Sequence, residues 1–179
     1  QMICGSAALQ PRLVRVFSAA GIPIWEGYGL TETSPVISVN CKKGYLWKIG
    51  TIGKPIEHIE VKIAEDGEIL CKGSNIMLGY YKNEEQTHNA IDEDGFFHTG
   101  DIGFLDEEGF LTITDRKKEM FKTSGGKYIA PQYIENKLKQ SRFIEQAMVV
   151  GEGEKMPAAF LQVNFAFVRE WLKRHGDKQ

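Results

Sequence analysis

The residues best suited to chemistry lie in one short run that reads Glu-Gly-Tyr-Gly-Leu-Thr-Glu-Thr, directly after an apolar segment. Gly27 and Gly29 allow the backbone to approach a ligand closely or to adopt a positive φ. Tyr28 offers a flat ring for stacking, Thr31 a hydroxyl, and Glu32 a carboxylate that can hold a divalent cation. An ordinary turn would explain any one of these residues, but not eight in this order. The run therefore predicts a ligand site.

These eight residues resemble the signature of the adenylate-forming superfamily, which includes acyl-CoA synthetases, aryl-CoA ligases, beetle luciferases and peptide-synthetase adenylation domains. The resemblance extends from Gly5 to the end of the chain. Upstream of the signature, Gly5, Ser6 and Ala7 match the family segment that lies along the adenine. Small side chains suit that place, because a flat base needs a close approach of the backbone.

The resemblance implies a role for each residue of the signature. Gly27 and Gly29 bind the nucleotide beside Tyr28, which stacks on the adenine. Thr31 bonds the phosphate and Glu32 holds Mg²⁺, and these two residues are the candidate catalytic pair. The cofactors implied are ATP or AMP and Mg²⁺, with CoA as a co-substrate.

A second motif, Thr-Gly-Asp at residues 99–101, resembles the family segment whose aspartate accepts hydrogen bonds from both ribose hydroxyls. Taken alone, Asp101 is typical of a turn, but its place in the order of motifs assigns it to the ribose. A carboxylate with two oxygens fits a vicinal diol through charge-assisted hydrogen bonds. Further on, residues 115–119 resemble the junction between the family's two domains, which places Arg116 at the ribose or phosphate and Lys118 at the hinge.

A glycine-rich loop over residues 123–127 resembles the family loop that turns toward the active site for the second half-reaction and lines the pantetheine tunnel. On this interpretation Gly125, Gly126 and Lys127 contact CoA. A Gly-Gly turn ahead of a helix that begins at Pro131 explains the local sequence almost as well. Both interpretations stay open.

The spacing of apolar residues predicts an α+β fold in two parts. The resemblance implies that residues 1–115 are the C-terminal part of a large adenylate-binding domain, with a βα unit and small β-barrel-like hairpins. Residues 116–179 would be a partial, mobile C-terminal domain, with the hinge at about 115–118. In the first part we expect a strand at 2–4, a helix at 9–20, a strand at 22–25, hairpins at 59–71 and 102–114, and a helix at 83–88 capped by Asn83. In the second part we expect a β-α-β-β-α pattern: a strand at 120–122, a helix at 131–139, strands at 143–150 and 158–163, and a helix at 165–175.

Composition makes several classes of protein a poor fit. A net charge of −2 gives no electrostatic reason to expect a nucleic-acid partner. No apolar run is long enough to cross a bilayer and no signal-peptide pattern opens the chain, although peripheral membrane contact remains compatible with the sequence. The three cysteines and four histidines form no ligand set, so no metal site made by side chains alone is expected. Reduced thiols predict a cytoplasmic location.

The implied activity is that of an acid–thiol ligase. A carboxylate attacks the α-phosphate of Mg-ATP, pyrophosphate leaves, and the thiol of CoA then attacks the acyl-adenylate and expels AMP. The sequence of residues 115–131 most resembles that of long-chain fatty acyl-CoA synthetases, so a fatty acid, ATP and CoA are the expected small-molecule substrates. Two alternatives stay open, an aryl- or medium-chain CoA ligase and a non-catalytic binding module of the same fold.

Two parts of the family do not occur in these 179 residues. One is the loop with a lysine that holds the β- and γ-phosphates, and the other is a second lysine near the family's C-terminal end. The chain also begins at Gln1, inside a run that reads as a strand. We therefore expect a fragment that makes no acyl-adenylate by itself.

Overall fold

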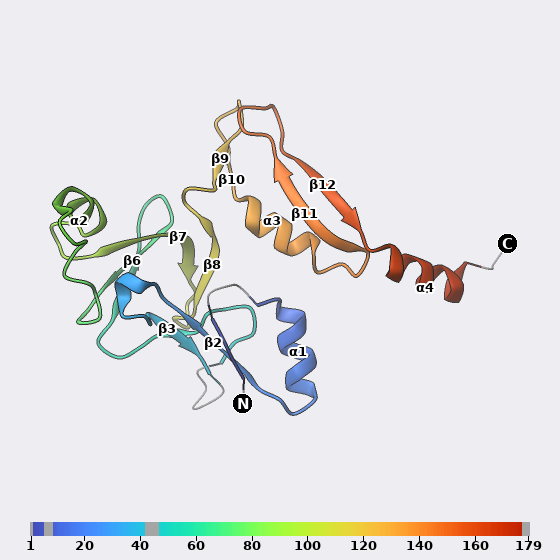
Figure 1. The fold of residues 1–179 in the computed structure, drawn as a ribbon, viewed down its shortest axis with the longest axis horizontal. Coiled ribbons are helices and arrows are strands. Elements are labelled where there is room, and N and C mark those ends of the chain that lie inside the picture. Colours follow the sequence, from blue (N-terminus) through green and yellow to red (C-terminus); the bar gives the residue numbers. More distant parts are fainter. Residues whose placement is uncertain (1, 6–8, 42–46, 177–179) are drawn as a thin grey trace. The chain divides into compact units, whose positions relative to one another are not determined.

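The computed structural model describes residues 2–5, 9–41 and 47–176, and it divides into two compact units (Figure 1). The first unit ends at Lys117 and the second begins at Lys118. The predicted boundary lies after Asp115, and the predicted hinge at about 115–118 includes the junction between the two units. The predicted α+β class is confirmed, because strands and helices occur in both units.

A four-stranded sheet carries the first motif. Its strands follow the order β1-β2-β3-β4. Their bounds are Met2–Cys4, Ile24–Tyr28, Ser38–Asn40 and Lys54–Pro55. β1 and β2 run parallel and are joined by α1 (Pro11–Ala19), whereas the other pairs are antiparallel. The two short strands β3 and β4 were not predicted, and β2 extends three residues past the predicted end at Trp25, so that Gly27 and Tyr28 belong to a strand.

A second, antiparallel sheet carries the second motif. Its strands follow the order β5-β6-β7-β8. Their bounds are Glu60–Ile63, Glu68–Lys72, Phe97–Leu105 and Leu111–Arg116. Both predicted hairpins are confirmed. The first turns at Gly67, whose φ of +86° suits a residue without a side chain.

Asp101 does not lie in a turn, although its residue type taken alone is typical of one. The residue lies in the middle of β7, which begins at Phe97, five residues before the predicted start at Ile102. The alternation of apolar residues fails at this point because β7 is irregular. Its pairing with β6 shifts between Glu68 and Leu70, and Gly100 has a φ of +72°.

Side chains from both sheets build the core of the first unit. Tyr28 and Ile37 come from the first motif and the segment that follows it, and they pack with residues of β6, β7 and β8. The members from the second sheet are Ile69, Cys71, Phe97 and Leu111. Burial raises the pKa of the Cys71 thiol to about 12, so this core cysteine stays protonated at neutral pH.

Two short helices complete the first unit. The 3₁₀ helix η1 (Thr31–Thr33) follows β2, and α2 (Glu84–Ala90) precedes β7. The predicted cap of α2 is confirmed, since the Asn83 side chain accepts a hydrogen bond from the Gln86 amide at 3.1 Å.

The second unit follows the predicted order with one additional strand, β10. It contains β9 (Phe121–Lys122), β10 (Tyr128–Ile129), α3 (Pro131–Leu138), β11 (Ile144–Val150), β12 (Ala158–Val163) and α4 (Phe165–His175). β9 pairs with β10 and β11 with β12, both antiparallel, and α3 packs on β11 (Figure 1). In the described part of the chain, no helix combines the length and the apolar character that a membrane span requires.

Glu26 is a buried acid in β2 that lies opposite Asn40 of β3. The Asn40 amide donates a hydrogen bond to Glu26 Oε2 at 3.1 Å. The same amide nitrogen also lies within hydrogen-bond distance of the carbonyls of Lys48 and Thr51. Burial raises the pKa of Glu26 from its ordinary 4.5, and the bond from Asn40 offsets this only in part. The ionised form is therefore costly in the folded state.

We predict that Glu26→Gln stabilises the chain at neutral pH. An acid whose folded pKa is raised loses stability as the pH rises from its unfolded to its folded pKa, and glutamine removes that loss. The urea midpoint of the variant should exceed that of the wild type at pH 7.5, and the difference should shrink toward pH 4. Glu60→Gln, at an exposed position of β5, controls for the lost charge. An equal or lower midpoint for Glu26→Gln at pH 7.5 would contradict the prediction.

Candidate functional site

Three residues assigned to nucleotide contact come together in the first unit. The Tyr28 hydroxyl donates a hydrogen bond to Asp101 Oδ2 at 2.7 Å, and Arg116 Nε lies 3.1 Å from Asp101 Oδ1. Tyr28 and Asp101 are buried, whereas the Arg116 side chain is 59% exposed. We call these three residues the acid cluster: a buried carboxylate held at both oxygens, with a cation at the surface.

Strand register brings the acid cluster together. Asp101 of β7 pairs directly with Arg116 of β8, and Tyr28 is the last residue of β2 in the neighbouring sheet. Burial, and then the charge of Asp101, raise the pKa of Tyr28 above its ordinary value of 10.0. The phenol therefore stays protonated at neutral pH and keeps its donor role toward the carboxylate.

Glu32, assigned to Mg²⁺, lies in η1 and is partly exposed. Its Oε1 accepts a hydrogen bond from the Tyr80 hydroxyl at 2.9 Å, and its backbone carbonyl accepts one from the Met77 amide at 2.8 Å. Partial burial, and then the bond to Glu32, raise the pKa of Tyr80, so the phenol remains a donor. The carboxylate is thus held in place before any ligand arrives.

Tyr80 was missed as a site residue. The Gly-Tyr-Tyr segment at residues 79–81 was predicted to be scaffold only, and no local pattern links Tyr80 to Glu32, 48 positions away. Only the folded structure shows this contact.

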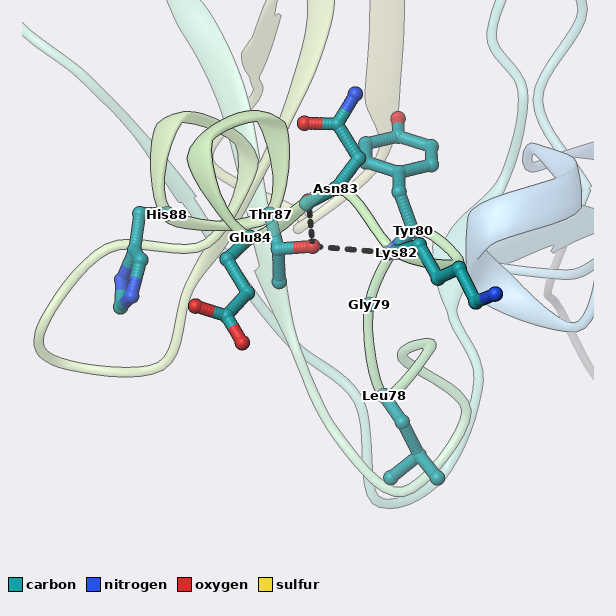
Figure 2. Close-up of a pocket in the computed structure, with 8 residues that line it drawn as sticks. All are labelled: Leu78, Gly79, Tyr80, Lys82, Asn83, Glu84, Thr87 and His88. Atoms are coloured by element: carbon teal, nitrogen blue, oxygen red, sulfur yellow. Dashed lines mark hydrogen bonds between the residues drawn. The ribbon is translucent and has the colours of Figure 1, made fainter.

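Tyr80 also borders an open hollow of about 340 Å³ between its loop and α2 (Figure 2). Thr87 Oγ1 accepts a hydrogen bond from the Tyr80 amide at 2.9 Å and donates one to the Asn83 carbonyl at 2.8 Å. These bonds fix the Tyr80 loop against the helix. None of the residues assigned to the nucleotide lines this hollow, so we interpret it as support for the loop.

The turn after β2 is fixed by Thr33. Its hydroxyl accepts a hydrogen bond from the Leu30 amide at 2.9 Å and lies within donor distance of the carbonyls of Leu30 and Pro35. A Cβ at Gly29 would lie 1.7 Å from the Pro35 carbonyl oxygen, so only glycine fits there. The same turn leaves Thr31 exposed, where its hydroxyl is free to meet a ligand.

The other predicted residues fall into three groups. Gly5 lies beside β2, where an added Cβ would be 3.6 Å from the Gly27 carbonyl oxygen. Ser6 and Ala7 lie outside the described residues. The residues assigned to the hinge and to CoA all belong to the second unit and are all exposed; they are Lys118, Gly125, Gly126 and Lys127.

The glycine-rich loop of the second unit has the geometry of a tight turn. The Thr123 amide donates to the Lys127 carbonyl at 3.0 Å, and Gly126 has a φ of +78°. These contacts fit the turn interpretation of this loop, and they leave the CoA assignment a prediction.

The residues present suit a cation that arrives with a phosphate. Over residues 2–5, 9–41 and 47–176, no group of three or more acidic, histidine or cysteine side chains could hold a metal ion. Mg²⁺ is commonly bound by one or two carboxylates together with substrate phosphates. A carboxylate has about four lone-pair sites, so Glu32 can accept the bond from Tyr80 and still ligate such an ion.

The chain is similar in sequence to known proteins. Residues 1–81 match the family of AMP-binding enzymes. A long-chain-fatty-acid–CoA ligase of Mycobacterium bovis is 42% identical over 97% of this chain and 28% of its own length. A 2-succinylbenzoate–CoA ligase of Listeria innocua is 39% identical over 96% of this chain and 37% of its own length.

Solved structures give the same result. The o-succinylbenzoate CoA synthetase of Bacillus subtilis, in complex with its acyl-adenylate intermediate, matches with a TM-score of 0.79 and 29% identity over 96% of this chain and 39% of that chain. The same enzyme in complex with ATP and a magnesium ion matches with a TM-score of 0.77 and 31% identity, over 90% and 36%. The chain therefore spans between 28% and 39% of the length of these relatives.

We predict that Gly29→Ala disrupts the turn that presents Thr31 and Glu32. The new methyl group would collide with backbone at Pro35, which cannot move as a flexible side chain can, so stability should fall by about 2 kcal/mol or more. Gly27→Ala is the matched control, because its Cβ would meet no atom within 4 Å. Urea unfolding measures both variants, and equal stabilities would show that the turn tolerates a side chain.

Proposed function

We propose that the protein is an ATP-dependent acid–thiol ligase. The match of residues 1–81 to the family of AMP-binding enzymes supports this proposal. In this proposal the whole enzyme activates a carboxylate as an acyl-adenylate and transfers the acyl group to CoA. The observation that carries the proposal is the acid cluster. A carboxylate held between a phenol and a guanidinium offers an acceptor for a ribose diol next to a cation for phosphate.

Each member of the acid cluster has a task in this proposal. Asp101 accepts hydrogen bonds from the ribose hydroxyls through the lone pairs that Tyr28 and Arg116 leave. Arg116, exposed at the end of β8, directs its remaining N–H groups toward the phosphate region. Tyr28 orients the carboxylate through its hydroxyl; the stacking of its ring on adenine stays a prediction, since Tyr28 is only 8% exposed and its ring packs in the core.

The first chemical step gathers negative charge around the α-phosphate as the substrate carboxylate attacks. Hydrogen-bond donors and cations fixed before the reaction stabilise such charge. We assign the Thr31 hydroxyl to a phosphate oxygen and Glu32 to the Mg²⁺ that accompanies ATP and offsets the phosphate charge. Tyr80 keeps the Glu32 carboxylate in a fixed orientation.

The second step needs a different set of contacts. We propose that Gly125, Gly126 and Lys127 contact CoA and that the chain turns about Lys118 between the two half-reactions. The exposure of all four residues supports this assignment, because a residue that meets CoA or changes partners cannot be buried. Small-molecule substrates in the cytoplasm, without a nucleic-acid partner, complete the proposal.

A long-chain fatty acid is the proposed acyl substrate. This substrate is supported by the sequence of residues 115–131 and by the 42% identity to a long-chain-fatty-acid–CoA ligase. An aromatic acid is the second candidate, favoured by the 2-succinylbenzoate–CoA ligase relative with 39% identity and by the likeness to the o-succinylbenzoate CoA synthetase. A panel of fatty, medium-chain and aromatic acids given to the intact enzyme distinguishes them, and ATP binding without turnover of any acid would favour the non-catalytic module.

We predict that Asp101→Asn weakens ATP binding by the intact protein about 10-fold to 100-fold, since a hydrogen bond to a charged group contributes about 1.5–3 kcal/mol. The sharper test uses 2′,3′-dideoxy-ATP, which lacks both ribose hydroxyls. The wild type should bind ATP more tightly than the dideoxy analogue, and the variant should bind the two almost equally. If Asp101→Asn discriminates as the wild type does, Asp101 does not contact the ribose.

We predict that Glu32→Gln removes most of the adenylation activity of the intact enzyme, because the amide cannot ligate Mg²⁺ as a carboxylate does. ATP–pyrophosphate exchange across a range of Mg²⁺ concentrations measures this effect. Glu60→Gln, at an exposed position of β5, is the matched control and should exchange normally. Normal turnover in Glu32→Gln would overturn the assignment of the metal.

A further inference from the structure

Glu68 is a buried carboxylate in β6 that the proposed chemistry leaves without a task. Only 3% of the residue is exposed. Its Oε1 accepts a hydrogen bond from the Gly100 amide at 2.9 Å. Its Oε2 accepts one from Lys117 Nζ at 2.7 Å and lies 3.0 Å from His98 Nδ1. Burying such a charge costs free energy, so this set of partners calls for an explanation.

The partner at Oε1 lies in the bulge of β7. Glu68 pairs with Ile102 and Leu70 with His98, so one residue of β6 faces the three residues 99–101 of β7. A bulge removes amides from the regular ladder, and each buried amide then needs another acceptor. The Glu68 carboxylate is that acceptor for Gly100, the residue directly before Asp101.

Lys117, one of the two partners of Oε2, completes a closed ring of contacts made by Glu68, Gly100 and Lys117. The Lys117 amide donates to the Gly100 carbonyl at 2.8 Å, while the Lys117 side chain returns to Glu68. Gly100 is therefore held on both sides, by the Glu68 side chain and by the Lys117 backbone. The next residue inward on each strand is a member of the acid cluster, Asp101 on β7 and Arg116 on β8.

The charges of this ring favour its closed form. Burial alone would raise the pKa of Glu68, but the bonds from Lys117, His98 and the Gly100 amide outweigh it and hold the pKa below its ordinary 4.5. Lys117 also lies 2.7 Å from Asp66 Oδ2. Hydrogen bonds to Asp66 and then to Glu68 raise the pKa of Lys117. Glu68 and Lys117 are thus both ionised at neutral pH.

We propose that Glu68 is a positioning residue for nucleotide binding: with Lys117 it holds the β7 bulge that aims the Asp101 carboxylate at Tyr28 and Arg116. This inference rests on the proposed function in one respect, that Asp101 is the group that contacts the ribose. It assigns Glu68 no contact with the ligand. Its effect should therefore fall mainly on recognition of the ribose hydroxyls, the groups that Asp101 is proposed to contact.

The test compares ATP with 2′,3′-dideoxy-ATP in the intact protein, by isothermal titration calorimetry. In Glu68→Ala the Gly100 amide loses its acceptor, so the preference for ATP should fall at least threefold, toward that of Asp101→Asn, while affinity for the dideoxy analogue stays within twofold. Glu68→Gln retains an acceptor for Gly100 and should recover part of the preference. An unchanged preference in a folded Glu68→Ala protein would overturn the proposal.

Two further variants separate positioning from loss of stability. Lys117→Met opens the ring from its half-exposed side and should also reduce the preference, with little risk to folding. Val14→Ala removes packing from α1, far in sequence from the ring, and should lower stability while leaving the preference unchanged. A reduced preference in Val14→Ala as well would mean that the readout reports only stability.

A ligand-free measurement keeps the inference distinct from the proposed function. If the wild type shows no preference for ATP over its dideoxy analogue, the ribose assignment fails, and a crystal structure of Glu68→Ala then decides the inference. The separation between the Tyr28 hydroxyl and Asp101 Oδ2, 2.7 Å in the wild type, should exceed hydrogen-bond distance in the variant. An intact bond would show that Glu68 does not position Asp101.

Discussion

The buried charge of Asp101 is the constraint on which the first unit depends. A carboxylate removed from water is tolerated only where donors satisfy its oxygens. Here the donors come from two other strands, Tyr28 at the end of β2 and Arg116 at the end of β8. The two sheets must therefore keep one relative position, and the apolar packing of the Tyr28 ring and Ile37 against the second sheet serves the same end.

The sequence predicts the elements of this fold well where a local pattern exists. The hairpins at Gly67 and after Leu105 follow from alternation and from turn residues, and α4 follows from helical spacing. It predicts poorly where pairing partners decide the structure. β3 and β4 are too short to show an alternation of apolar and polar residues. The bulge at Gly100 interrupts that alternation in β7, so the first half of the strand is not recognised from the sequence.

The candidate site divides in the same way. The resemblance to a family names Tyr28, Asp101 and Arg116, and the structure brings these three together. The residues that hold them carry no motif. Tyr80 reaches Glu32 across 48 positions and Glu68 reaches Gly100 across 32, and such contacts depend on strand register and loop packing. Reading along the chain cannot find them, because each of these residues is ordinary in its local context.

The ring around Gly100 also bears on the proposed hinge. Lys117 is tied to the first unit twice, by its amide on Gly100 and by its side chain on Glu68 and Asp66. Lys118 is the first residue of the second unit. A rotation that begins at Lys118 would therefore leave the pairing of Asp101 with Arg116 undisturbed, because the hydrogen bonds of Lys117 anchor the end of β8 to the first unit. In the proposed two-step reaction, the nucleotide side of the site then stays assembled while the contacts of the second unit are exchanged.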